Sequence, residues 1–180
     1  KSLTKRGLAV SRKSWSDKNF DWSNTNFAII RSTWDYFDKI DEFSDWLMNI
    51  KDKLVLINSF NLIKWNLNKS YLLDFSKKKI NIASSIFINS KNFTTLKKLF
   101  NQTNWDEAII KPAISGAAKN TFRVNKVNCD DFENIFRKLC DKETMIFQIF
   151  LKSIISFGEI SLMVFGGEYS HSVRKISKDG

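Results

Sequence analysis

The sequence has little proline, glycine, histidine or cysteine, and each scarcity excludes a class of protein. One Pro and six Gly in 180 residues leave no room for a flexible linker or a low-complexity tract. Cys129, Cys140 and the single histidine, His171, cannot supply a four-ligand structural zinc site, and free thiols are favoured over a disulfide. No apolar run reaches the roughly 18 residues of a membrane span, and no secretory signal is visible. We therefore expect a cytoplasmic protein without a membrane partner.

Apolar residues and positive charge are abundant. Hydrophobic residues make up 43% and aromatic residues 14% of the chain, which is enough for a substantial core. The formal net charge of +10 is compatible with a nucleic-acid partner, an anionic ligand or a lysine-rich solvated surface. The lysines are spread along the chain as far as its last six residues, and the aromatic residues fall on apparent core positions. A solvated surface is therefore favoured, and nucleic-acid binding is the weaker alternative.

The first part of the chain has the pattern of an α/β domain. Apolar runs predict strands at residues 8–10, 26–31 and 54–58, and the second run is apolar enough to be buried on both faces. Residues 41–50 place Phe43, Trp46, Leu47 and Ile50 at helical spacing. Strands that alternate with a helix indicate a parallel sheet with crossover connections.

The second part of the chain predicts an α+β arrangement with antiparallel strands. We expect helices at 68–79, capped by Asn68, at 93–100 and at 130–139. Strands are expected at 80–88, 107–111, 121–124, 145–150, 160–165 and 168–175. The last two are joined by Gly166-Gly167, which favours a tight hairpin turn with positive φ. A soft boundary between the two parts is placed near residue 105.

The stretch IIKPAISGAAKNTFRV, residues 109–124, combines a strand-end lysine with a loop of small residues. Small residues allow backbone N–H groups to approach a phosphate, and Lys111 would supply a cation in a fixed position. The order of residues matches neither a Walker A loop nor a dinucleotide-binding fingerprint. Taken alone, the stretch is more typical of an ordinary hairpin loop with an incidental lysine.

The loop stretch is one of four segments that follow one another in a characteristic order along the chain. They are IIRSTWDYFDKIDEFSDWL at 29–47, INSFNLIKWNLNKSYLLDF at 57–75, IIKPAISGAAKNTFRV at 109–124 and FQIFLKSIISFGEISLMVFGGEYSHSVRK at 147–175. Together they resemble the ATP-grasp superfamily, among its glutathione-synthetase-like members the bacterial group that includes the D-cycloserine-forming ligase. The resemblance implies an incomplete ATP-grasp fold, in which a parallel-sheet N-terminal domain precedes an antiparallel nucleotide-lid subdomain. It implies domains at 1–64, 65–105 (a linking segment) and 106–180.

The resemblance implies an ATP site with three parts. Two lysines and a small-residue loop would contact the phosphates, a hinge strand would read the adenine through its backbone, and an acidic residue would hold the ribose. In chain order the implied residues are Lys69, Lys111, Ser115, Gly116, Thr121, Gln148, Ile149, Phe150, Leu151 and Glu159.

An acceptor-substrate site is implied where a buried strand ends. Arg31, Ser32 and Asp35 follow the strand at 26–31, and ligands collect at the carboxyl ends of parallel strands. A structural Trp34 with an Arg31–Asp35 pair is an equally open reading. Lys175 is also implied to face a substrate phosphate or carboxylate, whereas His171 is interpreted as an ordinary strand residue.

The activity that the resemblance implies is ATP-dependent ligation of a carboxylate to an amine through an acyl phosphate. The expected ligands are ATP, Mg²⁺ and a small carboxylate or amino-acid-like substrate, and a homo-oligomer is possible. The first N-terminal strand and the metal-binding final third are expected to be missing, so no catalytic residue or metal ligand is assigned. We expect no turnover by these 180 residues alone. An inactive nucleotide-binding remnant is the alternative.

Overall fold

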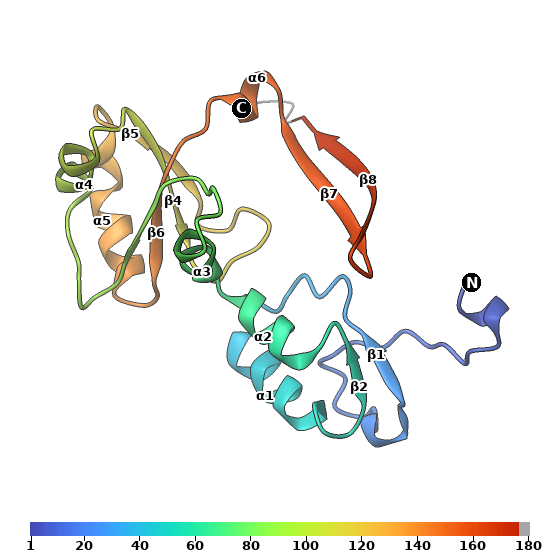
Figure 1. The fold of residues 1–180 in the computed structure, drawn as a ribbon. Helices are drawn as coiled ribbons and strands as arrows, with labels where there is room; N and C mark the ends of the chain where they lie inside the picture. The colour runs from blue at the N-terminus through green and yellow to red at the C-terminus, as the bar shows by residue number, and fades with distance from the viewer. Residues whose placement is uncertain (177–180) are drawn as a thin grey trace. The chain divides into compact units, whose positions relative to one another are not determined.

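The computed structural model describes residues 1–176 and contains two compact units (Figure 1). Unit 1 comprises residues 1–82 and 111–120, and unit 2 comprises residues 83–110 and the chain from residue 121 onward. Unit 1 contains η1 (Thr4–Arg6), η2 (Trp22–Asn24), β1 (Phe27–Ile29), α1 (Ile40–Ile50), β2 (Val55–Ile57), α2 (Phe60–Leu67) and α3 (Tyr71–Lys77). The segment 111–120, which follows the strand-end lysine, is therefore part of unit 1 although its flanking strands continue in unit 2.

Unit 1 is built around a two-stranded parallel sheet and α1. β1 and β2 pair in parallel, with Ala28 opposite Leu56. The predicted amphipathic helix is confirmed, and its apolar positions Phe43, Leu47 and Ile50 are buried. Trp15 packs edge-on against Phe43 with ring centroids 5.1 Å apart. The strand-helix-strand order of β1, α1 and β2 thus buries an aromatic core on one face of the sheet.

Several predictions for unit 1 are wrong in detail. Residues 8–10 form no strand, because Gly7 ends η1 at φ 83° and the following residues make no ladder. β1 is not buried on both faces, since Phe27 and Ile29 point outward and only Ala28 faces the core. The helix predicted at 68–79 covers only Tyr71–Lys77, and Asn68 ends α2 instead of capping α3. Helix α2, which Ser59 caps, is not among the predicted elements.

Unit 2 contains a four-stranded sheet in the order β3-β6-β4-β5. Its elements are β3 (Ser85–Ile88), α4 (Leu96–Thr103), β4 (Glu107–Pro112), β5 (Phe122–Asn125), α5 (Cys129–Cys140), β6 (Met145–Ile149), α6 (Ser153–Ser156), β7 (Glu159–Phe165) and β8 (Glu168–Lys175). β4 and β5 pair antiparallel, with Ile109 opposite Arg123, which confirms the predicted return strand. The strand predicted at 80–88 begins only at Ser85, and the helix predicted at 93–100 begins at Leu96 because Thr95 caps it.

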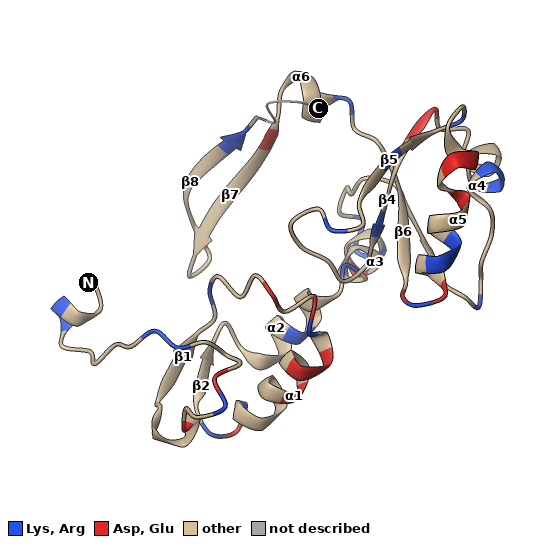
Figure 2. Cartoon of the chain, turned by 180° about the vertical axis from the view of Figure 1, so that it is seen from behind, with Lys and Arg blue, Asp and Glu red and all other residues tan. Residues whose placement is uncertain are grey.

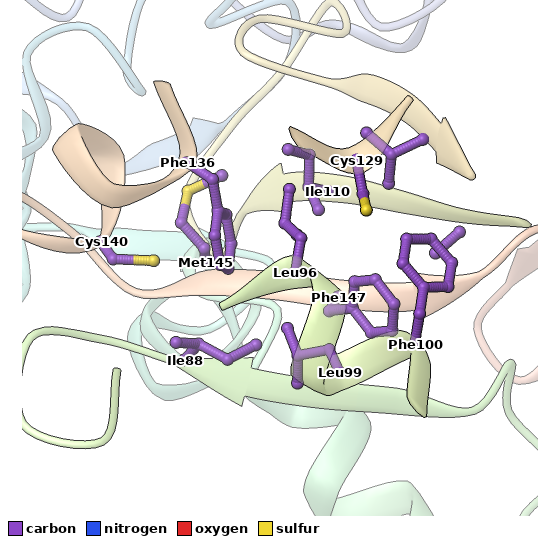
Figure 3. Packing of buried hydrophobic residues seen from close by; sticks show 12 residues of the cluster. Ile88, Leu96, Leu99, Phe100, Ile110, Cys129, Phe136, Cys140, Met145 and Phe147 are labelled. Atoms are coloured by element: carbon purple, nitrogen blue, oxygen red, sulfur yellow. The ribbon is translucent and has the colours of Figure 1, made fainter. Parts of the chain in front are cut away.

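The core of unit 2 lies between the sheet and the helices α4 and α5. Figure 3 shows Leu96, Leu99 and Phe100 from α4 and Phe136 from α5 packed with strand residues such as Phe147. Side chains along β4 point alternately to the two faces of the sheet. Ala108, Ile110 and Pro112 are therefore buried, while their neighbours are half-buried. Cys129 and Cys140 are free thiols buried at the two ends of α5. Eleven residues of helix separate them by about 16 Å, too far for a disulfide.

The hairpin of β7 and β8 is confirmed as an antiparallel pair. Gly166 and Gly167 have φ of 59° and 89°, as a tight primed turn requires. Both strands are largely exposed over the range that the structure describes, which ends at Ile176. The last lysine-bearing residues, 177–180, lie outside the described residues. Among the described helices, none has the length and apolar composition needed to cross a bilayer.

Candidate functional site

Lys111 lies on β4 just before the chain leaves the sheet. The alternation that buries Ile110 and Pro112 places Lys111 on the other face of the strand, together with Glu107 and Ile109. Lys111 is half-buried, and desolvation lowers the pKa of its ammonium group from the ordinary lysine value. Burial of a cation is costly unless an anionic or polar group offsets it. Lys111 already takes part in an interaction within the chain, and an anionic ligand beside it would offset more of this cost.

A second lysine reaches the loop that follows Lys111. The Nζ atom of Lys69 donates to the backbone oxygen of Ser115 at 2.8 Å, and the Lys69 backbone N–H donates to the Ala113 oxygen at 2.9 Å. Lys69 lies between α2 and α3, whose short connection holds it against the loop. Two predicted phosphate ligands, Lys69 and Ser115, are thus in contact across 46 residues of sequence.

The loop itself is tightly folded. Ala117, Ala118 and Asn120 have positive φ, and Lys119 N donates to the Gly116 oxygen at 3.0 Å. Positive φ is adopted readily by glycine and tolerated by asparagine, whereas an alanine side chain makes it costly. Thr121 follows the loop and leads into β5. Asn120 therefore suits its position, but the backbone path does not by itself explain Ala117 and Ala118.

A segment of unit 1 holds the loop in place. A Cβ atom on Gly116 would lie only 2.5 Å from Cε1 of Phe37, so the aromatic ring occupies the space that any side chain would need. Lys119 forms an ion pair with Asp38 in the same segment. The sequence analysis did not identify Phe37, Asp38 or Lys119 as candidates. Their only signal in the sequence is that they are close along the chain to the predicted site residues.

The predicted adenine-reading strand uses its backbone donors inside the sheet. Ile149 N donates to the Ser84 oxygen at 3.0 Å, and Phe150 N donates to the Glu107 oxygen at 3.1 Å. The side-chain Nε2 atom of Gln148 donates to the Ser85 hydroxyl at 2.8 Å. Ile149 and Phe150 can therefore offer a ligand their carbonyl oxygens or side chains, but not their N–H groups. Leu151 follows them and is exposed.

Two other predicted ligands face each other on the hairpin. Glu159 and Lys175 are opposite in the β7–β8 register, and Lys175 Nζ lies 3.6 Å from Glu159 Oε1. Both side chains are more than half exposed, so this pair contributes little to stability and is accessible to a ligand. His171 is exposed, with Nδ1 3.0 Å from the Ser170 hydroxyl.

The predicted acceptor residues lie beyond the end of β1. Arg31 and Ser32 are exposed, whereas Asp35 accepts a hydrogen bond of 2.8 Å from Trp15 Nε1 and is half-buried. The structural partner of Asp35 is therefore Trp15, and Trp34 is 73% exposed. A cavity of about 380 Å³ opens beside this segment, where β1 and β2 end. Its lining combines apolar side chains with Thr33, Tyr36, Asn58 and Asn66, and carries no charged residue.

A metal centre is not assembled within the described part of the chain. Over residues 1–176, no group of three or more His, Cys, Asp or Glu side chains could hold a metal ion. The residues present therefore do not fit a magnesium site, and no chemical step is assigned to a metal here.

The fold is similar to that of a known synthetase. The chain has a mixed α/β fold with several sheets that superimposes on the crystal structure of D-cycloserine synthetase DcsG with a TM-score of 0.88, at 22% identity, over 97% of this chain and 60% of that one. A family model described as "D-cycloserine synthetase DcsG, N-terminal domain" matches residues 1–58.

A sequence relative supports the same match. The cycloserine biosynthesis protein DcsG of Streptomyces lavendulae is 24% identical over 173 residues, which cover 94% of this chain and 58% of the relative. The chain is therefore homologous to DcsG, and it spans less than two thirds of the length of that relative.

Proposed function

We propose that this chain has an ATP-grasp fold and is the ATP-binding part of a cytoplasmic ligase that joins a carboxylate to an amine. The observation that carries the proposal is the contact between Lys69 Nζ and the Ser115 oxygen. It brings a second cation to the small-residue loop after Lys111, and two cations beside a tight loop suit a triphosphate. Homology to a protein named a synthetase is consistent with this function.

The two lysines have complementary roles in the proposal. Lys111 is fixed on β4 and loses hydration on burial, so it gains more from an anionic oxygen than an exposed lysine would. Lys69 exchanges its bond with the Ser115 carbonyl for a phosphate oxygen. Ser115, Gly116 and Thr121 line the phosphates. The carbonyls of Gln148, Ile149 and Phe150 and the backbone of Leu151 read the adenine, and Glu159 holds the ribose.

The acceptor is proposed to be a small carboxylate or amino-acid-like substrate at Arg31, Ser32 and Asp35, with Lys175 as a further cation. A carboxylate oxygen attacks the γ-phosphorus, the bond from that phosphorus to the β–γ bridging oxygen breaks, and ADP leaves. The amine nitrogen then attacks the acyl carbon, inorganic phosphate leaves with the bonding pair, and the nitrogen loses a proton. The uncharged cavity lined by Thr33, Asn58 and Asn66 would take a neutral part of a substrate.

The phosphate site is tested by titrating the chain with ATP. We expect Lys69→Met and Lys111→Met each to weaken ATP binding at least tenfold, because each removes a charge-assisted contact of roughly 1.5–3 kcal/mol. Lys98→Met, at an exposed position of α4, is the matched control and should leave the dissociation constant unchanged. Equal losses from all three variants would show a general charge effect and contradict the proposed site.

Ligase activity needs a separate measurement. The ligase proposal predicts ADP release that depends on both an acceptor carboxylate and an amine in the protein from its source cells. Release of ADP without any dependence on an amine would contradict it. Tight ATP binding without ADP release under any condition would favour the alternative, an inactive nucleotide-binding remnant.

A further inference from the structure

Glu107 and Arg123 form a polar network on unit 2 beside the segment 148–151. Arg123 on β5 contacts the Glu107 carboxylate through two nitrogens, Nε at 2.7 Å and a terminal guanidinium nitrogen at 2.5 Å, both to Oε2. Ile109 is the residue opposite Arg123, so Glu107 is its diagonal neighbour on the same face. Glu107 retains only 22% of its side-chain exposure. The Arg123 side chain is 43% exposed, so solvent still screens the pair, and its main effect is to fix the position of the guanidinium group.

Glu107 and Arg123 each contact Phe150. The backbone oxygen of Glu107 accepts from Phe150 N at 3.1 Å, which fixes the main chain. The Arg123 guanidinium carbon lies 4.0 Å from the centroid of the Phe150 ring, so the planar cation covers the ring. Because Glu107 also binds the nitrogens of this guanidinium group, the ring position depends on both residues.

A third contact extends the network past Leu151. Lys152 Nζ lies 3.8 Å from Oε1 of Glu107, the carboxylate oxygen that Arg123 does not use. Glu107 therefore contacts the chain on both sides of Leu151, through Phe150 and through Lys152. The main-chain hydrogen bond and the ring contact at Phe150 restrain the backbone path of this segment, whereas the Lys152 side chain is 75% exposed and its ion pair adds little. A restrained backbone is the condition for reading a flat base by backbone groups.

We propose that Arg123 and Glu107 are positioning residues that set the base-reading conformation of residues 148–151 and so determine the preference for adenine. The inference rests on the proposed ATP-binding function and assigns two residues that the phosphate contacts do not involve. Arg123 acts through Phe150, and Glu107 acts through the Phe150 main chain, Arg123 and Lys152.

The test measures recognition of the base and of the phosphates separately, by using adenosine and inorganic tripolyphosphate as ligands that each carry one part of ATP. Dissociation constants for adenosine, inorganic tripolyphosphate, ATP and GTP are measured with the full 180-residue chain. In Arg123→Met we expect adenosine binding to weaken about fivefold to tenfold, tripolyphosphate binding to change less than about twofold, and the ATP-to-GTP preference to fall. Lys111→Met should show the opposite pattern, with loss of tripolyphosphate and retention of adenosine.

A matched control is available on α5. Arg137 covers the Phe93 ring at 4.5 Å, so Arg137→Met removes the same kind of contact elsewhere in unit 2. It should change none of the four constants. Arg123→Lys keeps the charge but loses the planar fork and should give an intermediate loss of adenosine affinity, as should Glu107→Gln. These two variants supply the readout if Arg123→Met does not fold, as judged by its thermal transition.

The outcomes distinguish the inference from the function on which it rests. Equal loss of adenosine and tripolyphosphate in the Arg123 variants, no loss of either, or a matching effect in Arg137→Met would overturn the positioning role alone. So would a wild-type chain that binds ATP and GTP equally well. A wild-type chain that binds none of the four ligands would overturn the proposed function and the inference together.

Discussion

Burial shifts the pKa values of the Lys111 and Cys140 side chains in opposite directions. Burial disfavours the charged form of each group, so it lowers the pKa of the Lys111 ammonium and raises the pKa of the Cys140 thiol to about 12. For the lysine, an anionic ligand would reverse the shift. For the cysteine, which lies in the apolar core of unit 2, burial makes the thiol chemically inert.

ATP binding should therefore depend on pH through Lys111. The charged ammonium is needed for phosphate contact, and its proton is lost at a lower pH than the ordinary value of about 10.4. We expect ATP affinity to fall as pH rises through this lowered pKa, by at most about tenfold per pH unit. Calorimetric titrations between pH 7 and pH 10 would measure it. Lys111→Arg should bind ATP with a flatter profile, and an identical slope in both proteins would contradict the role of Lys111.

The two thiols should be unreactive in the folded chain. Cys129 and Cys140 are 3% and 1% exposed, and a thiol with a pKa of about 12 is a thiolate in only on the order of 10⁻⁴ of molecules at pH 8. Assay with a disulfide reagent should show two slow thiols in the native chain and two fast ones in guanidinium. Rapid stoichiometric reaction without denaturant would disprove this burial.

At the scale of elements, the loop after β4 depends on a close contact with the segment after β1. Gly116 has no positive φ to favour glycine, so the constraint on it is steric and comes from Phe37. Lys119 and Asp38 add an ion pair between the same two segments. The identity of residue 116 is thus determined by a residue 79 positions earlier in the sequence.

Gly116→Ala should destabilise unit 1 by about 1–3 kcal/mol, the usual cost of overpacking. Phe37→Leu in the same chain should recover part of that loss, because it frees the space that the added methyl group needs. Chemical unfolding of both single variants and the double variant would give the coupling free energy. Ser115→Ala is the control without added bulk. Strictly additive effects would show that the two residues do not meet.

At the scale of the whole molecule, the charge of +10 is dispersed. Lys and Arg occur in both units, and so do Asp and Glu (Figure 2). Several lysines and arginines also form ion pairs with acidic side chains. Examples are Arg123 with Glu107 and Lys119 with Asp38. A dispersed charge of this kind favours solubility and nonspecific attraction over a defined nucleic-acid interface.

Binding to RNA or DNA should therefore be weak and sensitive to salt. At 0.15 M salt we expect dissociation constants in the nonspecific range of about 10⁻⁴ to 10⁻⁶ M, weakening steeply at higher salt. Fluorescence anisotropy with a short RNA and a DNA duplex would measure them. Affinity near 10⁻⁸ M at this salt concentration would favour the nucleic-acid alternative.

The sequence by itself determined the elements whose signal is local. Helical spacing predicted α1 and α5, because side-chain periodicity follows directly from backbone geometry, and paired glycines predicted the β7–β8 turn. The strand at 107–111 and its return at 121–124 were also predicted, and they correspond to β4 and β5. The one-sided exposure of β1 and the capped helix α2 were missed, since a short apolar run does not reveal which of its faces is covered.

Only the tertiary structure decided which distant residues meet. Lys69 and Ser115, Phe37 and Gly116, and Arg123 and Phe150 are contacts between segments that no periodicity links. The sequence pattern selected Lys69, Lys111 and the loop as candidates through a resemblance, but it could not show that Lys69 reaches the loop or that Arg123 covers the Phe150 ring. Local patterns encode the direction of a side chain, whereas its partner depends on how the packed elements bring the chain together.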